Sequence, residues 1–311
     1  MAVKKMKVLI ADKIAQKGID YLSSNGLEVD LLTDESRPRL VEMIPDYDAI
    51  IVRSATQVTA ELISAGTNLK VIGRAGVGLD NIDQVAAKEH NIAVVNAPEG
   101  PSQTVAEAAL ALLLAVAREI PRLDAGVKSG KWLKKSAKGV QLGGTTLGII
   151  GTGLIGANLL RLALAIGMKV VGYDIIIYDE LVKLENFRYV ETLDELYAEA
   201  DVISLHVPLI PPTKHMLNEE AFNKMKDGVI ILNCARGGII DEKALVKALD
   251  SGKVRGAGLD VFESEPNPLA ELVNHPNVVA TPHIGAVTKA SQENVARITC
   301  VKVVEELKKV N

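Results

Sequence analysis

Residues 147–156 read Leu-Gly-Ile-Ile-Gly-Thr-Gly-Leu-Ile-Gly, an apolar run that ends in a Gly-x-Gly-x-x-Gly pattern at Gly151, Gly153 and Gly156. The pattern is typical of a buried strand that turns sharply into a helix, where missing side chains let backbone N–H groups approach a pyrophosphate. The stretch begins almost halfway along the chain. The residues before it are therefore expected to form a separate unit.

The glycine pattern alone is a weak signal, so its sequence context decides how it is interpreted. Residues 154–166 have apolar positions at helical spacing, and a second apolar strand begins at 168–172. That strand ends at Asp174, where a carboxylate can accept hydrogen bonds from both hydroxyls of an adenine-side ribose and would repel a 2′-phosphate. The order of strand, helix, strand and acid predicts an NAD site rather than an NADP site, and a glycine-rich turn without a ligand is the alternative.

The composition is that of an ordinary globular protein. The chain has 311 residues, of which 48% are hydrophobic and 24% charged, and its net charge is −4. This length allows about two domains, and the absence of a basic excess argues against a nucleic-acid partner. No stretch approaches the roughly 20 apolar residues of a membrane span. Because Cys234 and Cys300 are the only cysteines and no Cys/His cluster has zinc spacing, we expect a cytoplasmic protein with neither disulfides nor a metal.

Short apolar runs alternate with amphipathic stretches along most of the chain, which is typical of parallel sheets. The break at 98–101 precedes a strongly apolar helix at 102–117, which is expected to be buried between layers or at a subunit contact. Strands are predicted at 8–11, 27–32, 49–52, 71–73, 92–95, 201–205, 229–232, 257–261 and 278–280, and further helices at 15–24, 59–65, 242–249 and 288–309, the last with Thr288 as N-cap.

The C-terminal helix would pack back on the first domain, which makes the nucleotide domain an insertion. We therefore predict an α/β protein of two domains. A Rossmann-type doubly wound parallel sheet at 99–284 is inserted into a smaller flavodoxin-like α/β substrate domain formed by 1–98 and 285–311. The two crossings would form a hinge, with the cofactor and a small substrate meeting in the cleft between the domains.

Hydride transfer requires a group that moves the proton of the substrate hydroxyl and a cation that orients the substrate. Of the five histidines, His283 follows a predicted strand and so lies at the carboxyl edge of the sheet, where ligands bind. His206 also follows a strand and is expected to border the cofactor. Glu265 and Arg236 follow two other strands, and they would supply an acidic partner for His283 and the cation. Spacing alone does not separate this triad from ordinary loop charges.

Longer motifs surround these residues. They read Asn233-Cys234-Ala235-Arg236-Gly237-Gly238-Ile239-Ile240-Asp241, Gly258-Leu259-Asp260-Val261-Phe262 with Glu265-Pro266, and Pro282-His283-Ile284-Gly285. With the glycine pattern and Asp174, they resemble the D-isomer-specific 2-hydroxyacid dehydrogenases over essentially the whole chain. The resemblance implies Arg236 as substrate anchor, His283 as proton donor or acceptor, and Glu265 as its partner. It implies NAD contacts from Gly151, Gly153, Leu154, Ile155, Gly156, Asp174, His206, Val207, Pro208, Cys234, Ala235, Arg236, Asp260, His283, Gly285 and Ala286.

The first domain carries motifs of its own, Arg53-Ser54-Ala55-Thr56, Gly73-Arg74-Ala75-Gly76-Val77-Gly78-Leu79-Asp80-Asn81-Ile82-Asp83 and Asn96-Ala97-Pro98. They resemble family members that oxidise D-3-phosphoglycerate to 3-phosphohydroxypyruvate at the entry to serine biosynthesis. The resemblance implies substrate binding by Arg53, Ser54, Arg74, Gly76, Val77 and Gly78. Arginines suit a phosphate with up to two charges, and glyoxylate reductases of the family generally lack one at position 74. A surface salt bridge is the alternative for Arg74.

The sequence departs from the family's pattern at three places. Residues 175–177 are Ile-Ile-Ile where a proline commonly follows the acid, so the adenine pocket is expected to be unusually apolar. Val287 stands where serine is usual, and Val77 where threonine is frequent. The chain also stops at Asn311 without the regulatory domains of long family members, so feedback inhibition by serine through such a domain is not expected.

Two other functions remain open. One is reduction of hydroxypyruvate, glyoxylate or a D-lactate-type substrate, and the other is an NAD-sensing binding or scaffold protein, although the set of Arg236, Glu265 and His283 weighs against a scaffold. The apolar helix at 102–117 and the lysine-rich segment around Trp132 suggest a homodimer, as is usual in the family, with Lys134 reaching the partner subunit. A solvated helix and loop is the alternative for that segment.

Overall fold

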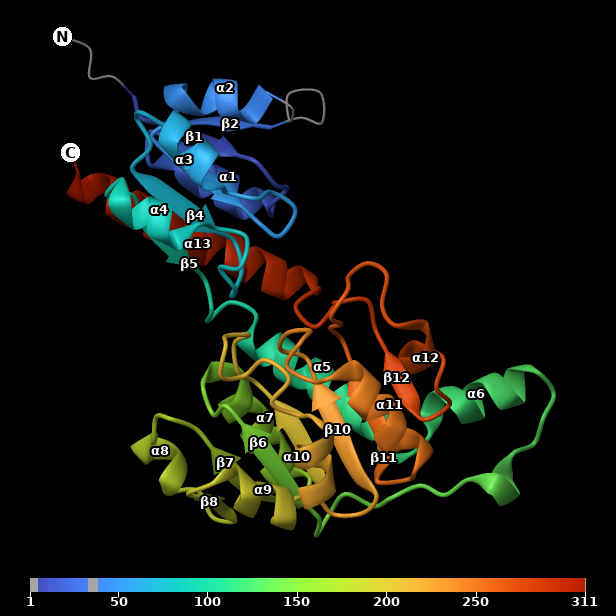
Figure 1. The fold of residues 1–311 in the computed structure, drawn as a ribbon. Helices are drawn as coiled ribbons and strands as arrows, with labels where there is room; N and C mark the ends of the chain where they lie inside the picture. The colour runs from blue at the N-terminus through green and yellow to red at the C-terminus, as the bar shows by residue number, and fades with distance from the viewer. Residues whose placement is uncertain (1–4, 33–38, 311) are drawn as a thin grey trace. The chain divides into compact units, whose positions relative to one another are not determined.

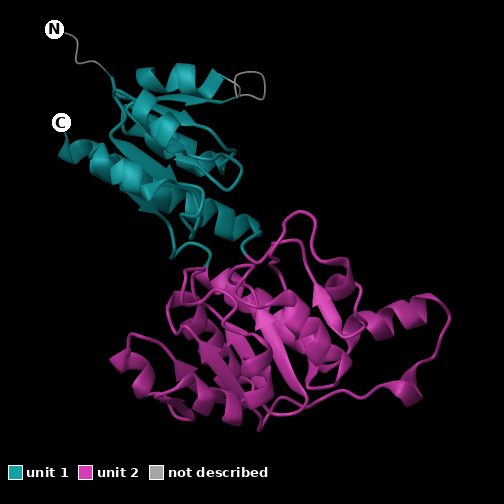
Figure 2. Cartoon of the chain, in the orientation of Figure 1, with its two compact units in different colours: residues 1–101, 286–311 teal, residues 102–285 magenta. Residues whose placement is uncertain are grey.

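The structure is a computed structural model that describes residues 5–32 and 39–310. The chain divides into two compact units (Figure 2), of which unit 1 comprises residues 1–101 and 286–311 and unit 2 comprises residues 102–285. From the sequence, the crossings between domains are predicted at 98–101 and 284–288. The C-terminal helix belongs to unit 1, and the chain therefore enters and leaves unit 2 once each.

Unit 1 is built on a parallel sheet with the strand order β2-β1-β3-β4-β5, which is the flavodoxin-like order. Successive side chains of β3 point to opposite faces of this sheet. Ile51 packs with side chains of α1 and α13, and Ile50 packs with side chains of α2, α3 and α4. The elements are β1 (Lys7–Ile10), α1 (Gln16–Ser24), β2 (Glu28–Leu31), α2 (Leu40–Met43), β3 (Ala49–Val52), α3 (Ala60–Ala65), β4 (Val71–Arg74), α4 (Gln84–Glu89), β5 (Ala93–Asn96) and α13 (Lys289–Lys309).

Helix α13 begins as the sequence predicted, because the Thr288 side chain accepts a hydrogen bond from the Ser291 backbone at 3.1 Å. The helix then lies on β4, where Gly73 makes room for it. A Cβ at position 73 would be 2.7 Å from Val303 and 3.1 Å from Thr299. The close packing of α13 on the sheet is what ties the C-terminal segment to the N-terminal half of the chain in one unit.

Unit 2 is built on a parallel sheet of seven strands in the order β12-β11-β10-β9-β6-β7-β8. Figure 1 labels all of these strands except β9. The order reverses between β6 and β9, so the loops after these two strands flank the switch point of a doubly wound Rossmann-type sheet, as predicted. The elements are α5 (Ser102–Ala117), α6 (Ile120–Lys128), β6 (Thr146–Ile150), α7 (Leu154–Ala165), β7 (Lys169–Tyr173), α8 (Asp179–Val182), β8 (Phe187–Tyr189), α9 (Leu193–Glu199), β9 (Val202–Leu205), α10 (Glu219–Lys224), β10 (Val229–Asn233), α11 (Glu242–Asp250), β11 (Val254–Leu259), α12 (Ala270–Val273) and β12 (Val278–Ala280).

The apolar helix α5 is buried between layers, which is one of the two positions expected for it. It packs against α7 and against β10 and β11. Two glycines of β11 let it approach, since a Cβ at Gly256 or Gly258 would lie 2.9 Å from Val116 or Leu112 respectively. The alternating glycines therefore shape the sheet surface to the helix. No helix of the described residues is long and apolar enough to cross a membrane.

One strand was predicted with the wrong bounds and another was missed. Strand β11 begins at Val254 and ends at Leu259, whereas 257–261 was predicted, because Arg255 and Gly256 interrupt the apolar run that marks a buried strand. Strand β8 was missed altogether. It has only three residues, includes the exposed Arg188 and lies at the edge of the sheet, so no apolar period reveals it.

Candidate active site

His283 and Glu265 form a hydrogen-bonded pair in unit 2. Nδ1 of His283 lies 2.8 Å from Oε2 of Glu265, and Oε1 of the same carboxylate accepts a hydrogen bond from the Phe262 backbone at 3.0 Å. Because a carboxylate can only accept, the neutral imidazole carries its proton on Nδ1, which leaves Nε2 to exchange a proton with a substrate. The His283 side chain is 51% exposed, so a small molecule can reach it.

The loop that carries His283 is held by the buried carboxylate of Asp260. Oδ1 of Asp260 accepts hydrogen bonds from the Thr281 hydroxyl at 2.6 Å and the Ile284 backbone at 2.8 Å, and Oδ2 accepts one from the Gly285 backbone at 2.7 Å. His283 has a backbone φ of 54°, a conformation that residues other than glycine adopt only when their surroundings impose it. Asp260 therefore fixes the direction in which the imidazole projects.

Arg236 lies in a turn that Asn233 closes. The Asn233 amide donates to the Arg236 carbonyl at 2.9 Å, and its oxygen accepts from the Ala235 backbone at 3.0 Å. The next residue, Gly237, lies directly against the backbone of Phe262, where a Cβ would be 1.8 Å from the carbonyl oxygen. The loop after β10 thus contacts the loop that carries Glu265, and the structure brings all three predicted catalytic residues onto adjoining loops.

The glycines of the turn between β6 and α7 differ in what surrounds them. A Cβ at Gly156 would be 2.0 Å from the Gly151 carbonyl oxygen, and one at Gly151 would be 2.5 Å from the carbonyl oxygen of His206. Gly153 instead has no described atom within 4 Å of its Cβ position. It is also the N-cap of α7, which has no side-chain cap among the described residues, so the first N–H groups of α7 can bind an anion. The turn therefore fits a pyrophosphate.

Asp174 follows β7 at the same edge of the sheet as the glycine turn. Its Oδ2 accepts a hydrogen bond from the Thr152 backbone at 2.6 Å. The three residues after it are Ile175, Ile176 and Ile177, whose exposed fractions are 92%, 53% and 54%. An acid beside an exposed apolar loop suits a ribose and the adenine attached to it, in keeping with the predicted apolar pocket.

The side chains of His206 and Cys234 are both uncharged near neutral pH. Burial lowers the pKa of His206 to about 4, and Nε2 of its ring lies 2.9 Å from the Ser204 hydroxyl. Burial and the nearby charge of Asp260 raise the pKa of the Cys234 thiol to about 12. Both side chains suit the lining of a cofactor site, whereas the His283 side chain is exposed and paired with the Glu265 carboxylate.

In unit 1, hydrogen bonds hold the loop that carries Arg53 and Ser54. This loop follows β3, next to the point between β1 and β3 where the strand order reverses. Asp12, which follows β1, accepts hydrogen bonds from the Arg53 backbone at 2.7 Å, the Thr56 backbone at 3.1 Å and the Thr56 hydroxyl at 2.9 Å. The Asn81 amide donates to the carbonyls of Arg53 at 2.7 Å and Thr56 at 2.6 Å. Neither Asp12 nor Asn81 was predicted from the sequence to hold this loop. An acid directly after the first predicted strand was the signal that would have identified Asp12.

Arg74 ends β4, and its side chain folds over Gly76. A Cβ at position 76 would be 1.4 Å from Nη1 of Arg74, so only glycine permits this arrangement. The Asn96 amide holds the following residue by donating to the Val77 carbonyl at 2.6 Å. The guanidinium and the backbone of residues 76–78 therefore lie side by side at the carboxyl edge of the sheet, where both can contact anionic groups of a bound molecule.

Comparison with known proteins identifies relatives over nearly the whole chain. Residues 110–285 match the family described as "D-isomer specific 2-hydroxyacid dehydrogenase, NAD binding domain". A D-3-phosphoglycerate dehydrogenase from Archaeoglobus fulgidus is 48% identical over 307 residues, which are 97% of this chain and 58% of that protein. A hydroxypyruvate reductase from Thermotoga maritima is 47% identical over 296 residues, which are 94% of this chain and 95% of that protein.

A solved structure agrees with the sequence relatives. The D-lactate dehydrogenase of Aquifex aeolicus, complexed with NAD and lactic acid, has a TM-score of 0.84 and 33% identity, with 98% of this chain and 96% of that chain covered. This chain spans somewhat more than half of the A. fulgidus protein, at 58%. NAD as cofactor, predicted from the glycine turn and Asp174, is confirmed by the family match. The chain belongs to the D-isomer specific 2-hydroxyacid dehydrogenases, and residues 110–285 are its NAD-binding domain.

Proposed function

We propose that this protein oxidises D-3-phosphoglycerate to 3-phosphohydroxypyruvate, with NAD as the oxidant. The observation that carries the proposal is the arrangement of Arg74 over Gly76 at the carboxyl edge of the unit 1 sheet. Arg74 is a second cation in addition to Arg236. One cation, Arg236, is already needed for the carboxylate that every 2-hydroxy acid carries. A second anionic group on the substrate accounts for that additional cation.

His283 moves the proton in the proposed reaction. NAD, when bound, accepts the hydride that leaves C2 of the substrate. Nε2 of His283 takes the proton of the C2 hydroxyl, and the Glu265 carboxylate, 2.8 Å from Nδ1, stabilises the imidazolium that forms. Reduction of the keto acid returns the same proton from Nε2 to the oxygen.

The arginines hold the two ends of the substrate. Arg236 binds the carboxylate next to C2, and its charge favours the developing carbonyl oxygen. Arg53 and Arg74 bind the phosphate, and the backbone N–H groups of residues 76–78 add hydrogen bonds to the carboxylate. Asp12 and Asn81 keep the loop of Arg53 in place through the contacts described above.

Reduction of hydroxypyruvate is the second candidate function. The T. maritima hydroxypyruvate reductase matches this chain over 95% of its own length, which favours an unphosphorylated substrate. Such a substrate has no anionic group for Arg74. A steady-state assay of 2-hydroxy and 2-keto acids with NAD and NADP separates the two functions, and cofactor binding without any turnover would indicate an NAD-sensing scaffold instead.

Substitution Arg74→Ala should raise the KM for D-3-phosphoglycerate by about tenfold or more, because it removes a charge-assisted contact to phosphate. The KM for D-glycerate, which lacks the phosphate, should change much less. Lys70→Ala is the matched control, since Lys70 lies before the amino end of the same strand and pairs with Asp48 at 3.0 Å. Equal effects of Arg74→Ala on both substrates would point to an unphosphorylated substrate.

We further propose that the protein is a homodimer that buries the surface around α6. The apolar side chains Ile120, Val127 and Trp132 are 54%, 59% and 80% exposed there. Exposed apolar groups gathered on one segment are typical of a protein–protein interface. Lys134, close to Trp132 in sequence, is the residue proposed to reach the partner's substrate.

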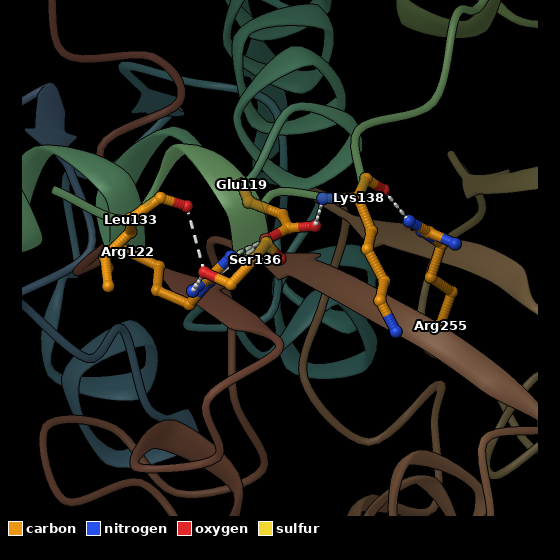
Figure 3. Close-up of polar contacts among 6 residues, drawn as sticks. All are labelled: Glu119, Arg122, Leu133, Ser136, Lys138 and Arg255. Carbon is orange, nitrogen blue, oxygen red and sulfur yellow. Dashed lines mark hydrogen bonds and ion pairs between the residues drawn. The ribbon is translucent and has the colours of Figure 1, made fainter.

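A polar network holds the segment that follows Trp132 (Figure 3). The Glu119 carboxylate accepts hydrogen bonds from the Lys138 backbone at 2.9 Å and from Nε of Arg122 at 3.0 Å. Arg255, on β11, donates to the Lys138 carbonyl. The pairing with Arg122 and the bond from Lys138 lower the pKa of Glu119 despite its partial burial. An ordered segment of this kind is suited to docking on a second subunit.

Substitution Val127→Asp should therefore weaken the dimer by an order of magnitude or more, since it would bury an unpaired carboxylate at the interface. Light scattering after size-exclusion chromatography measures the mass across a dilution series. Val85→Asp is the control, because Val85 is 70% exposed on α4 in unit 1 and the change in charge is the same. A dimer that survives Val127→Asp as well as Val85→Asp would contradict the proposed interface.

A further inference from the structure

A chain of hydrogen bonds leads from the edge strand β8 to Asp174. The backbone N–H of Tyr178 lies 3.4 Å from the Tyr189 hydroxyl, which lies 2.9 Å from Oγ1 of Thr152. Oγ1 of Thr152 in turn lies 3.2 Å from Oδ2 of Asp174, the oxygen that also accepts from the Thr152 backbone at 2.6 Å. Thr152 is 1% exposed, so water does not compete for its hydroxyl.

Only one arrangement of protons satisfies these contacts. An ionised carboxylate cannot donate, so the Thr152 hydroxyl gives its single proton to Asp174. The Thr152 oxygen therefore accepts from the Tyr189 hydroxyl, whose own oxygen accepts from the Tyr178 backbone. Every donor points toward Asp174, and hydrogen bonds aligned in this way strengthen one another in a dry environment.

Close packing holds the two hydroxyl groups in place. Gly172 on β7 lets both partners approach the sheet, since a Cβ there would be 2.9 Å from Cγ2 of Thr152 and 2.9 Å from the Phe187 ring. The Phe187 ring meets the Tyr189 ring edge to face, with centroids 4.9 Å apart. Neither hydroxyl can move far without disturbing these buried contacts.

The same chain of bonds determines the shape of the loop after Asp174. Oδ1 of Asp174 accepts from the Ile176 backbone at 3.1 Å, and the Tyr178 backbone is held by Tyr189. The exposed isoleucines at 175–177 are thus fixed on both sides by bonds that depend on Asp174 and Tyr189. The orientation of the carboxylate and the position of the apolar loop are set together.

We propose that Thr152 and Tyr189 are positioning residues that hold Asp174 and the loop at 175–177 for an adenine-side ribose with an unmodified 2′-hydroxyl. They thereby set the preference for NAD over NADP. This inference rests on the proposed role of Asp174 at the ribose. Neither residue touches the reacting atoms, so their effect is on which cofactor binds rather than on the chemical step.

Titration calorimetry of the 311-residue protein with NAD and with NADP, in the absence of substrate, tests the inference. Thr152→Val and Tyr189→Phe each remove one hydroxyl with little change in size. Each should raise the NAD dissociation constant about threefold to tenfold and alter that for NADP less, which lowers the NAD preference. Thr152→Ser, which keeps the hydroxyl, should retain the preference. Tyr178→Phe is the matched control, because only the Tyr178 backbone N–H enters the chain of bonds.

The Asp174→Ala variant, measured in parallel, shows which assignment fails. An unchanged NAD preference in both Thr152→Val and Tyr189→Phe, together with a reduced preference in Asp174→Ala, would overturn the positioning role alone. An unchanged preference in Asp174→Ala would overturn the ribose assignment as well. Because no substrate is present, an error in the proposed substrate cannot produce either result.

Discussion

Substitution of His283 by alanine is expected to lower kcat by roughly two to four powers of ten, because the hydroxyl proton then has no base to receive it. The affinity for NAD should stay within a few-fold of the unmodified protein. In the proposed reaction His283 acts through Nε2, whereas the contacts of the loop to Asp260 use the Thr281 hydroxyl and the backbone of residues 284 and 285. Stopped-flow measurement of NADH formation, with calorimetry for NAD, separates the two quantities.

His90→Ala provides the control for this experiment. His90 lies at the end of α4 in unit 1, and its Nδ1 contacts the Ala86 carbonyl at 2.9 Å, so its loss should leave kcat nearly unchanged. Glu265→Gln should lower kcat less than His283→Ala does, because the imidazole remains and only the stabilisation of its charge is reduced. Turnover retained by His283→Ala would exclude this histidine as the base.

The second large effect is expected from Gly237→Ala. The new methyl group would lie 1.8 Å from the Phe262 carbonyl oxygen and 2.1 Å from its carbon, so the loops carrying Arg236 and Glu265 must separate. Overpacking of this kind costs about 1–3 kcal/mol of unfolding free energy. A displacement of about 1 Å at a catalytic group can cost about 100-fold in rate, and we expect a loss of that order in kcat/KM together with a lower Tm.

Gly143→Ala is the matched control for Gly237→Ala. Its nearest neighbour would be the Ile166 carbonyl oxygen at 3.5 Å, an ordinary contact distance, so both Tm and kcat/KM should change little. If Gly237→Ala behaved like Gly143→Ala, the close approach of the two loops would not depend on the glycine. The loops carrying Arg236 and Glu265 would then have to be held together by other contacts.

Much of the fold follows from patterns within short stretches of sequence. Strand β3 was predicted with the bounds Ala49–Val52 that the structure has, and helix α5 with the bounds Ser102–Ala117. Both are strongly apolar segments between clear breaks, so neighbours in the chain decide their conformation. The strand β8 lacks such a pattern, since it gains its place only by pairing with β7.

Some residues of the candidate site could likewise be predicted from the sequence, and others could not. Residues at the ends of predicted strands, such as His283 and Arg236, could be named from the sequence because parallel strands deliver their carboxyl ends to one edge. Some of the residues that position such groups could not be named, because their partners lie far along the chain. Asn81 holds the loop of Arg53, and Tyr189 acts on Asp174 through Thr152.

The sequence by itself determined the fold class, the NAD cofactor and the family of this protein. Glycine spacing, apolar runs and strand-end charges are local, and each constrains the backbone within a few residues. The tertiary structure alone decided which loop lies against Gly237 and how the hydroxyl of an unpredicted edge strand reaches Asp174. These depend on distances between residues remote in sequence, which close packing of the two sheets and their helices sets within each unit.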